Sequence, residues 1–134
     1  YVFSSETEDF VVKVNNGKHM DKGYLEYIKF CHENKGNPHL PKIGQVKKYD
    51  DWYIVFIEKL EDFEELGGYS KLNIVIDIKD EADGWKTSIT GDIVDQVKDC
   101  GKLLKKIKYL GDDDFHVDNL MKRGDTLVIT DPLR

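Results

Sequence analysis

Apolar residues alternate with polar or small residues in several short runs, and this alternation is typical of half-buried β-strands. In the run Phe10–Val14, residues 10, 12 and 14 share one face and residues 11 and 13 share the other. Turn-forming residues separate the runs, at Asn15-Asn16-Gly17, Tyr49-Asp50-Asp51 and Gly124-Asp125. The predicted strands are Tyr1–Phe3, Phe10–Val14, Ile43–Lys48, Trp52–Glu58, Leu120–Arg123 and Thr126–Thr130. The last four form two hairpins.

Two other segments have the spacing of amphipathic helices. Asp21–Glu33 repeats apolar residues at helical intervals, with Asp21 as a plausible N-cap. Ser88–Leu110 carries a stripe from Ile93 to Ile107, with Asp92 near its start, and ends at a glycine. Tyr69–Lys79 fits a strand and a helix equally well, and periodicity does not decide such a short run.

Composition narrows the class of protein. A chain of 134 residues corresponds to one domain. Its net charge of −6 argues against a nucleic-acid binder, since a phosphate backbone requires a basic surface. The basic stretch Lys102–Lys108 is interpreted as the solvated side of a helix. No apolar run approaches about 18 residues, so no membrane span is expected, and no signal peptide is visible.

The cysteines and histidines do not predict a reactive centre. Cys31 and Cys100 each lie in an apolar helical pattern, which favours buried thiols in a reducing cytosol. The four histidines lack the paired spacing of zinc ligands.

The end of the chain carries the candidate chemistry. Asp114 is followed five positions later by Asn119, then by an apolar hairpin, and then by Asp131. The hairpin brings its two ends together, so Asn119 and Asp131 could both bind one Mg²⁺, a cation that prefers oxygen ligands. Asp114 could then accept the proton of a hydroxyl, while Lys13 could contact phosphates. Each residue alone is more typical of a polar loop, a turn or a solvent-facing strand position; their combination favours phosphoryl transfer.

This order of residues resembles a known family. Asp114-x-His116-x-x-Asn119, followed by a hairpin and Ile129-Thr130-Asp131-Pro132, is similar to the catalytic segment of kinase-like phosphotransferases. More specifically, the chain resembles the serine/threonine protein kinases made early in infection by short-tailed lytic coliphages. The other matching pieces are Val12–Val14, Phe30-Cys31, Asn37–Pro41, Trp52–Phe56, Asp99–Leu103, Met121 and Gly124-Asp125.

The resemblance implies an α+β, protein-kinase-like fold in one domain, 1–134. Residues 1–60 would form an N-lobe-like antiparallel sheet with one helix, and residues 61–134 a reduced helical C-lobe carrying the catalytic-loop hairpin. It also implies that Tyr69–Lys79 is helical, and that ATP and Mg²⁺ are the cofactors.

The site residues carried over from the resemblance are Lys13 for the nucleotide, Asp114 as the catalytic base, and Asn119 and Asp131 as metal ligands. Glu26 is the candidate partner of the lysine, with Asp21 as the alternative. The connector from Glu58 to Leu60 would offer backbone groups to the adenine edge, which makes both residues members of the expected cofactor site.

The expected function is therefore a phage-type serine/threonine protein kinase that acts on host proteins in the host cytoplasm during host takeover. A glycine-rich phosphate loop is expected upstream of Tyr1, because it should precede the strand at Phe10. Two alternatives stay open. One is a catalytically inactive kinase-fold protein, a pseudokinase, whose acidic surface binds and inhibits a host factor. The other is a small-molecule phosphotransferase.

Overall fold

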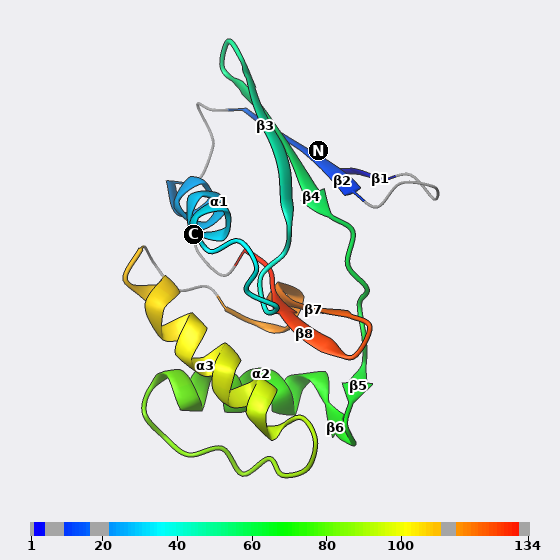
Figure 1. Cartoon of the computed structure of the whole chain (residues 1–134), viewed down its shortest axis with the longest axis vertical. Helices are drawn as coiled ribbons and strands as arrows, with labels where there is room; N and C mark the ends of the chain where they lie inside the picture. Colours follow the sequence, from blue (N-terminus) through cyan, green and yellow to red (C-terminus); the bar gives the residue numbers. More distant parts are fainter. Residues whose placement is uncertain (1, 5–9, 17–21, 111–114, 132–134) are drawn as a thin grey trace.

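The computed structural model describes residues 2–4, 10–16, 22–110 and 115–131, and it is a mixed α+β structure (Figure 1). Three helices and three small antiparallel sheets make up the described chain. The strands are β1 (Val2–Ser4), β2 (Phe10–Asn16), β3 (Ile43–Tyr49), β4 (Trp52–Glu58), β5 (Glu65–Leu66), β6 (Tyr69–Ser70), β7 (Leu120–Arg123) and β8 (Thr126–Ile129). The helices are α1 (Lys22–Glu33), α2 (Lys71–Ala82) and α3 (Val94–Lys108), with a 3₁₀ turn η1 at Val117–Asn119.

The largest sheet contains four strands in the order β1-β2-β4-β3, all paired antiparallel. Lys13 of β2 pairs with Val55 of β4, so the two side chains share one face of the sheet. Lys13 lies over the ring of Tyr24 in α1, and Val55 is fully buried. The face that carries Lys13 is therefore the one covered by α1.

The second half of the described chain packs two helices together. The exposed residues of α2 alternate with buried residues at helical spacing, and the apolar ones among these are Ile74, Val75, Ile78 and Ala82. The facing side of α3 buries Val97, Cys100, Gly101, Leu103, Leu104 and Ile107. Both rows belong to one continuous apolar core, which also includes Tyr24, Tyr27 and Ile28 of α1.

The β7–β8 hairpin lies between the helix pair and the sheet with α1 (Figure 1). Its buried residues are Leu120, Leu127, Val128 and Ile129. The two-residue turn at Gly124-Asp125 places Gly124 at a φ of 61°, a value that glycine adopts without strain. The hairpin is therefore the element that brings residues 119 and 131, which flank its two strands, close together at a half-buried position.

The helical interpretation of Tyr69–Lys79 is confirmed, since Lys71–Ala82 forms α2. The Oγ of Ser70 accepts a hydrogen bond from the N–H of Asn73, which caps the first turn. Residues 69 and 70 instead form β6, paired with β5 around a Gly67-Gly68 turn that the sequence pattern did not predict.

The predicted helix Ser88–Leu110 is wrong at its start, because α3 begins only at Val94. The Oγ1 of Thr87 accepts the N–H of Ile89, and Gly91 has a φ of 94°, so both positions depart from helical geometry. Asp92 does not cap the helix; the N-cap is Ile93, which makes no side-chain capping bond. The predicted N-cap of the first helix, Asp21, lies outside the described residues.

Across the described ranges, no helix has both the length and the apolar character required to cross a membrane.

The close approach of α2 and α3 gives a first prediction. A Cβ on Gly101 would overlap the Cβ of Glu81 and come within 3.3 Å of the backbone N of Ala82. Gly101→Ala should therefore lower the free energy of unfolding by about 1–3 kcal/mol, although alanine favours a helix. Chemical denaturation checks the value, with Lys102→Ala on the exposed side of α3 as the control. A stabilised Gly101→Ala protein would contradict this packing.

Candidate functional site

Lys13 and Asp131 meet between the sheet and the C-terminal hairpin. Lys13 projects from β2, and its Nζ lies 3.5 Å from Oδ2 of Asp131, the second residue after β8. The same ammonium group lies 4.0 Å from the centroid of the Tyr24 ring, a cation–π contact that orients it from the α1 side. Both charged side chains keep about a third of their surface exposed, 27% and 34%. The pair is thus accessible to a ligand from solvent.

Asp131 adopts an unusual backbone conformation with a φ of 37°. This left-handed region is disfavoured for residues with a Cβ, and Asp and Asn tolerate it better than most. The backbone turn is stabilised by Asn119, whose Nδ2 donates to the carbonyl of Asp131 over 2.7 Å. Next to it, the N–H of Thr130 donates to the carbonyl of Asn119. The direction of the Asp131 side chain is therefore fixed by its neighbours.

Asn119 closes the 3₁₀ turn at the same time. Its Oδ1 accepts the backbone N–H of His116 at 3.0 Å, while Nδ1 of His116 accepts the N–H of Asp118. Both atoms of the Asn119 amide thus bind backbone. An amide oxygen has two lone pairs, so Oδ1 keeps capacity for one more interaction.

The negative charge of Asp131 affects the pKa values of titratable side chains on one face of α1. Burial, and then the charge of Asp131, raise the pKa of Tyr24 above its ordinary value. Burial is also the main reason that the pKa of Cys31 rises to about 12. Burial raises the pKa of Tyr27 as well, and its hydroxyl donates a hydrogen bond to the carbonyl of Ile129. The phenol groups of Tyr24 and Tyr27 and the thiol of Cys31 therefore favour their neutral forms.

The structure does not bring every predicted site residue to this place. Glu26 is an exposed residue of α1, and the ion pair found for Lys13 in the described chain is with Asp131. Leu60 is half-buried, just before the isolated bridge between Glu61 and Lys122. The predicted catalytic base Asp114 lies outside the described residues.

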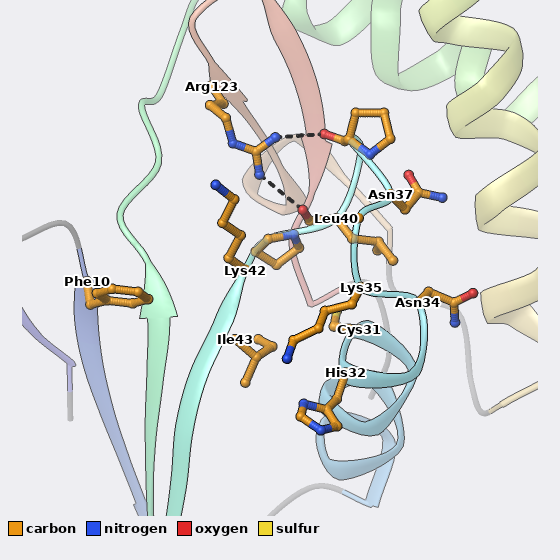
Figure 2. A pocket seen from close by; sticks show the side chains of 13 residues that line it. Phe10, Cys31, His32, Asn34, Lys35, Asn37, Leu40, Lys42, Ile43 and Arg123 are labelled. Atoms are coloured by element: carbon orange, nitrogen blue, oxygen red, sulfur yellow. Dashed lines mark hydrogen bonds between the residues drawn. The ribbon is translucent and has the colours of Figure 1, made fainter.

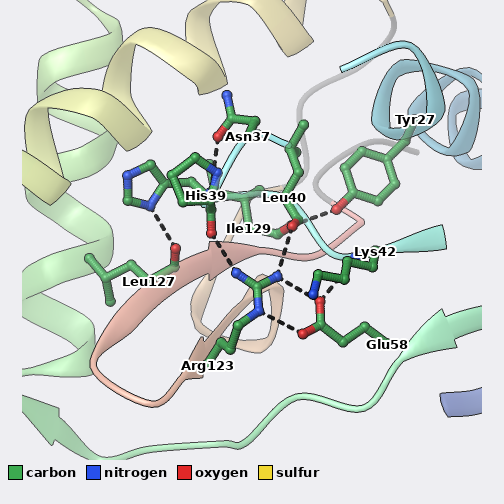
Figure 3. Close-up of polar contacts among 10 residues, drawn as sticks. Tyr27, Asn37, His39, Leu40, Lys42, Glu58, Arg123, Leu127 and Ile129 are labelled. Atoms are coloured by element: carbon green, nitrogen blue, oxygen red, sulfur yellow. Dashed lines mark hydrogen bonds and ion pairs between the residues drawn. The ribbon is translucent and has the colours of Figure 1, made fainter. Parts of the chain in front are cut away.

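Glu58 has a structural partner that the sequence pattern did not indicate. Arg123 of β7 donates from Nε and Nη2 to the two carboxylate oxygens of Glu58, each over 2.6 Å. The remaining donors reach the carbonyls of Pro38 and Leu40, at 3.0 and 3.1 Å (Figure 3). The backbone N–H of Glu58 is also used, by the carbonyl of Lys42. Arg123 is one of only two arginines in a lysine-rich chain. Because arginine can bind a carboxylate with two parallel hydrogen bonds and lysine cannot, this choice of residue is a signal in the sequence that could have indicated its role.

His39 is a second residue whose role sequence reasoning missed. It is buried, and its Nδ1 lies 2.7 Å from the carbonyl of Leu127. Its own carbonyl accepts the N–H of Ile129. The loop after α1 is thereby attached along β8, which is the strand that leads to Asp131 (Figure 3).

Across the described residues, no group of three or more His, Cys, Asp or Glu side chains could hold a metal ion. Asn119 reaches Asp131 through its Nδ2, which donates to the backbone carbonyl of Asp131, while its Oδ1 accepts the N–H of His116. Mg²⁺ commonly takes one or two protein oxygen ligands and keeps several waters, so a carboxylate and an amide oxygen are of the chemical type that Mg²⁺ prefers, in contrast to the nitrogen and sulfur ligands of structural zinc sites.

No protein-family model matches the chain, and no curated protein matches it. The geometry of these residues is therefore the basis for any statement about function.

The arginine junction yields a second prediction. Arg123→Lys keeps the charge but loses the fork that serves one carboxylate and two carbonyls, so the free energy of unfolding should fall by about 2–3 kcal/mol. Denaturant titration measures this. The control is Lys122→Met, which removes a surface ion pair to Glu61 and should cost less than about 1 kcal/mol. Equal losses in the two variants would contradict the proposed role of the fork.

The same junction predicts a dependence on pH. Burial raises the pKa of Glu58, but hydrogen bonds from Arg123 and from the Lys42 N–H outweigh it and hold the pKa below the ordinary value of 4.5. The stabilisation is fully present above pH 4.5 and is lost as the pH falls through the folded-state pKa. Glu58→Gln should therefore unfold with a weaker acid dependence than the unaltered chain, measured by thermal melts below pH 5.

Proposed function

We propose that this chain is a phage-type serine/threonine protein kinase, which transfers a phosphoryl group from ATP to host proteins in the host cytoplasm. The observation that carries the proposal is the meeting of Lys13 and Asp131, residues from opposite ends of the chain, at a partly exposed position. Kinase-like enzymes need a lysine for the phosphates and an acid for the metal on facing sides of one cleft. On this proposal the fold is kinase-like, with residues 1–60 as the N-lobe-like region and residues 61–134 as the reduced C-lobe-like region.

Each residue then has one task. Lys13 binds oxygens of the non-transferred phosphates and exchanges some of its contact with Asp131 for them. Asp131 and Asn119 would hold Mg²⁺, which when bound neutralises charge on the phosphates. Asp114 accepts the proton of the acceptor hydroxyl. Tyr24 holds the ammonium of Lys13 in place, the task that the sequence led us to expect of Glu26 or Asp21.

The connector from Glu58 to Leu60 is assigned to the adenine end of the nucleotide. The Glu58 side chain serves by fixing the connector to β7 through Arg123, and Leu60 is the residue whose backbone would face the base. This arrangement would keep β4 and β7 at a constant separation while the nucleotide binds.

A second candidate function is supported by Asn119. Both atoms of its amide already bind backbone, as expected if the residue serves only to shape the turn before Asp131. In that case the chain is a kinase-shaped protein without catalysis, and its acidic surface binds and inhibits a basic host factor.

Transfer of labelled phosphate from magnesium-ATP, to the chain itself or to host proteins, tests the kinase proposal. Asp131→Asn keeps the shape of the side chain but removes its charge, and it should lower the rate at least about 100-fold. Lys13→Met and Asp114→Asn should have comparable effects. Lys47→Met, at an exposed position of strand β3 in the same sheet, is the matched control and should leave transfer unchanged.

The outcome separates the candidates. If the unaltered protein transfers no phosphate and magnesium-ATP does not raise its melting temperature, the inhibitory binding function replaces the kinase proposal. Labelling of a soluble metabolite, with no protein labelled, would instead indicate a small-molecule phosphotransferase.

A further inference from the structure

A cavity of about 390 Å³ opens between the end of α1, the loop that follows it and the start of β3 (Figure 2). This volume lies within the range of sites for small molecules. The described residues that line the cavity include neither Lys13 nor Asp131. It is therefore separate from the candidate site for phosphoryl transfer.

The walls of the cavity are mainly apolar. Phe10, Leu40, Pro41 and Ile43 provide an aromatic ring, two aliphatic side chains and a rigid pyrrolidine. The loop that carries Leu40 is held in place by the hydrogen bonds that Arg123 donates to its carbonyls. A preformed wall lowers the entropic cost of binding, so an apolar body could be accepted without rearrangement.

The charged groups around the cavity are all basic. Its described lining contains Lys35, Lys42 and Arg123, with His32, and contains no Asp or Glu, although the chain as a whole has a net charge of −6. Arg123 is already occupied by Glu58 and the two carbonyls. Lys35 is in no ion pair with a described residue, and Figure 2 shows it reaching across the opening between α1 and β3. An anion is the ligand that this rim favours.

We propose that this cavity binds a small amphipathic carboxylate, one with an aromatic or aliphatic body and a single negative charge. The body would pack on Phe10, Leu40 and Ile43, while the carboxylate would lie near Lys35 and Lys42. An inorganic anion lacks an apolar body to pack on the walls, and an organic cation finds no Asp or Glu among the described residues that line the cavity. The proposal does not depend on phosphoryl transfer.

Titration with 2-naphthoate, followed by amide chemical shifts, tests the site. Saturable shifts are expected for the non-proline residues of 34–43 and for Phe10, with a Kd below about 1 mM. Two matched probes separate the contributions: acetate has the charge without the body, and 2-naphthylmethylammonium has the same ring with the opposite charge. Both should bind at least about tenfold more weakly.

Variants of the two lysines test which side chains attract the carboxylate of the ligand. Lys35→Gln with Lys42→Gln should weaken 2-naphthoate at least about fivefold, whereas Lys29→Gln, an exposed α1 position that does not line the cavity, should have no effect. The proposal is overturned if the cation binds as tightly as the carboxylate, if the shifts map elsewhere, or if the double variant binds normally. It is also overturned if a peptide carrying Asp next to Phe binds far more tightly than the free carboxylate, because the occupant would then be a protein segment.

Discussion

The fork between Arg123 and Glu58 joins segments of the molecule that are far apart in the sequence. The guanidinium group of Arg123 binds the end of β4 and the loop after α1, and the backbone of Arg123 belongs to the hairpin that ends near Asp131. Lysine could neutralise the carboxylate, but it could not serve two oxygens and two carbonyls in one plane. Because β4 pairs with the strand that carries Lys13, and the hairpin leads to Asp131, the position of these two residues opposite each other depends on this junction.

Buried polar side chains also hold the hairpin in place. His39 binds β8 through its ring and its carbonyl, and Tyr27 binds the carbonyl of Ile129. A buried polar group without a hydrogen-bond partner lowers the free energy of unfolding, and the His39 Nδ1 and the Tyr27 hydroxyl both have a partner. The loop 34–42 is therefore packed firmly against β8, the strand that leads to Asp131. The same loop forms one wall of the cavity next to the end of α1.

The strands of the four-stranded sheet and the β7–β8 hairpin could be predicted from the sequence because alternation and turn residues are local signals, whereas the two-residue strands β5 and β6 are too short to show alternation. The start of α3 could not, since the bond between Thr87 and Ile89 and the backbone of Gly91 compete with a helix that the apolar stripe alone would extend. Lys13, Asn119 and Asp131 could be grouped through their order in the chain. Arg123 was missed because its partner lies 65 residues away, and no periodicity reports such a contact.

The left-handed backbone at Asp131 has a consequence for how this position can vary. Two separate requirements restrict the residue at position 131. The left-handed backbone conformation favours Gly, Asn and Asp, and the ion pair with Lys13 requires an acid. Glutamate could form the ion pair but is disfavoured by the backbone conformation. Asparagine and glycine suit the backbone conformation but carry no charge for the ion pair. Aspartate is the residue that best satisfies both, so the backbone conformation and the ion pair favour the same side chain at this position.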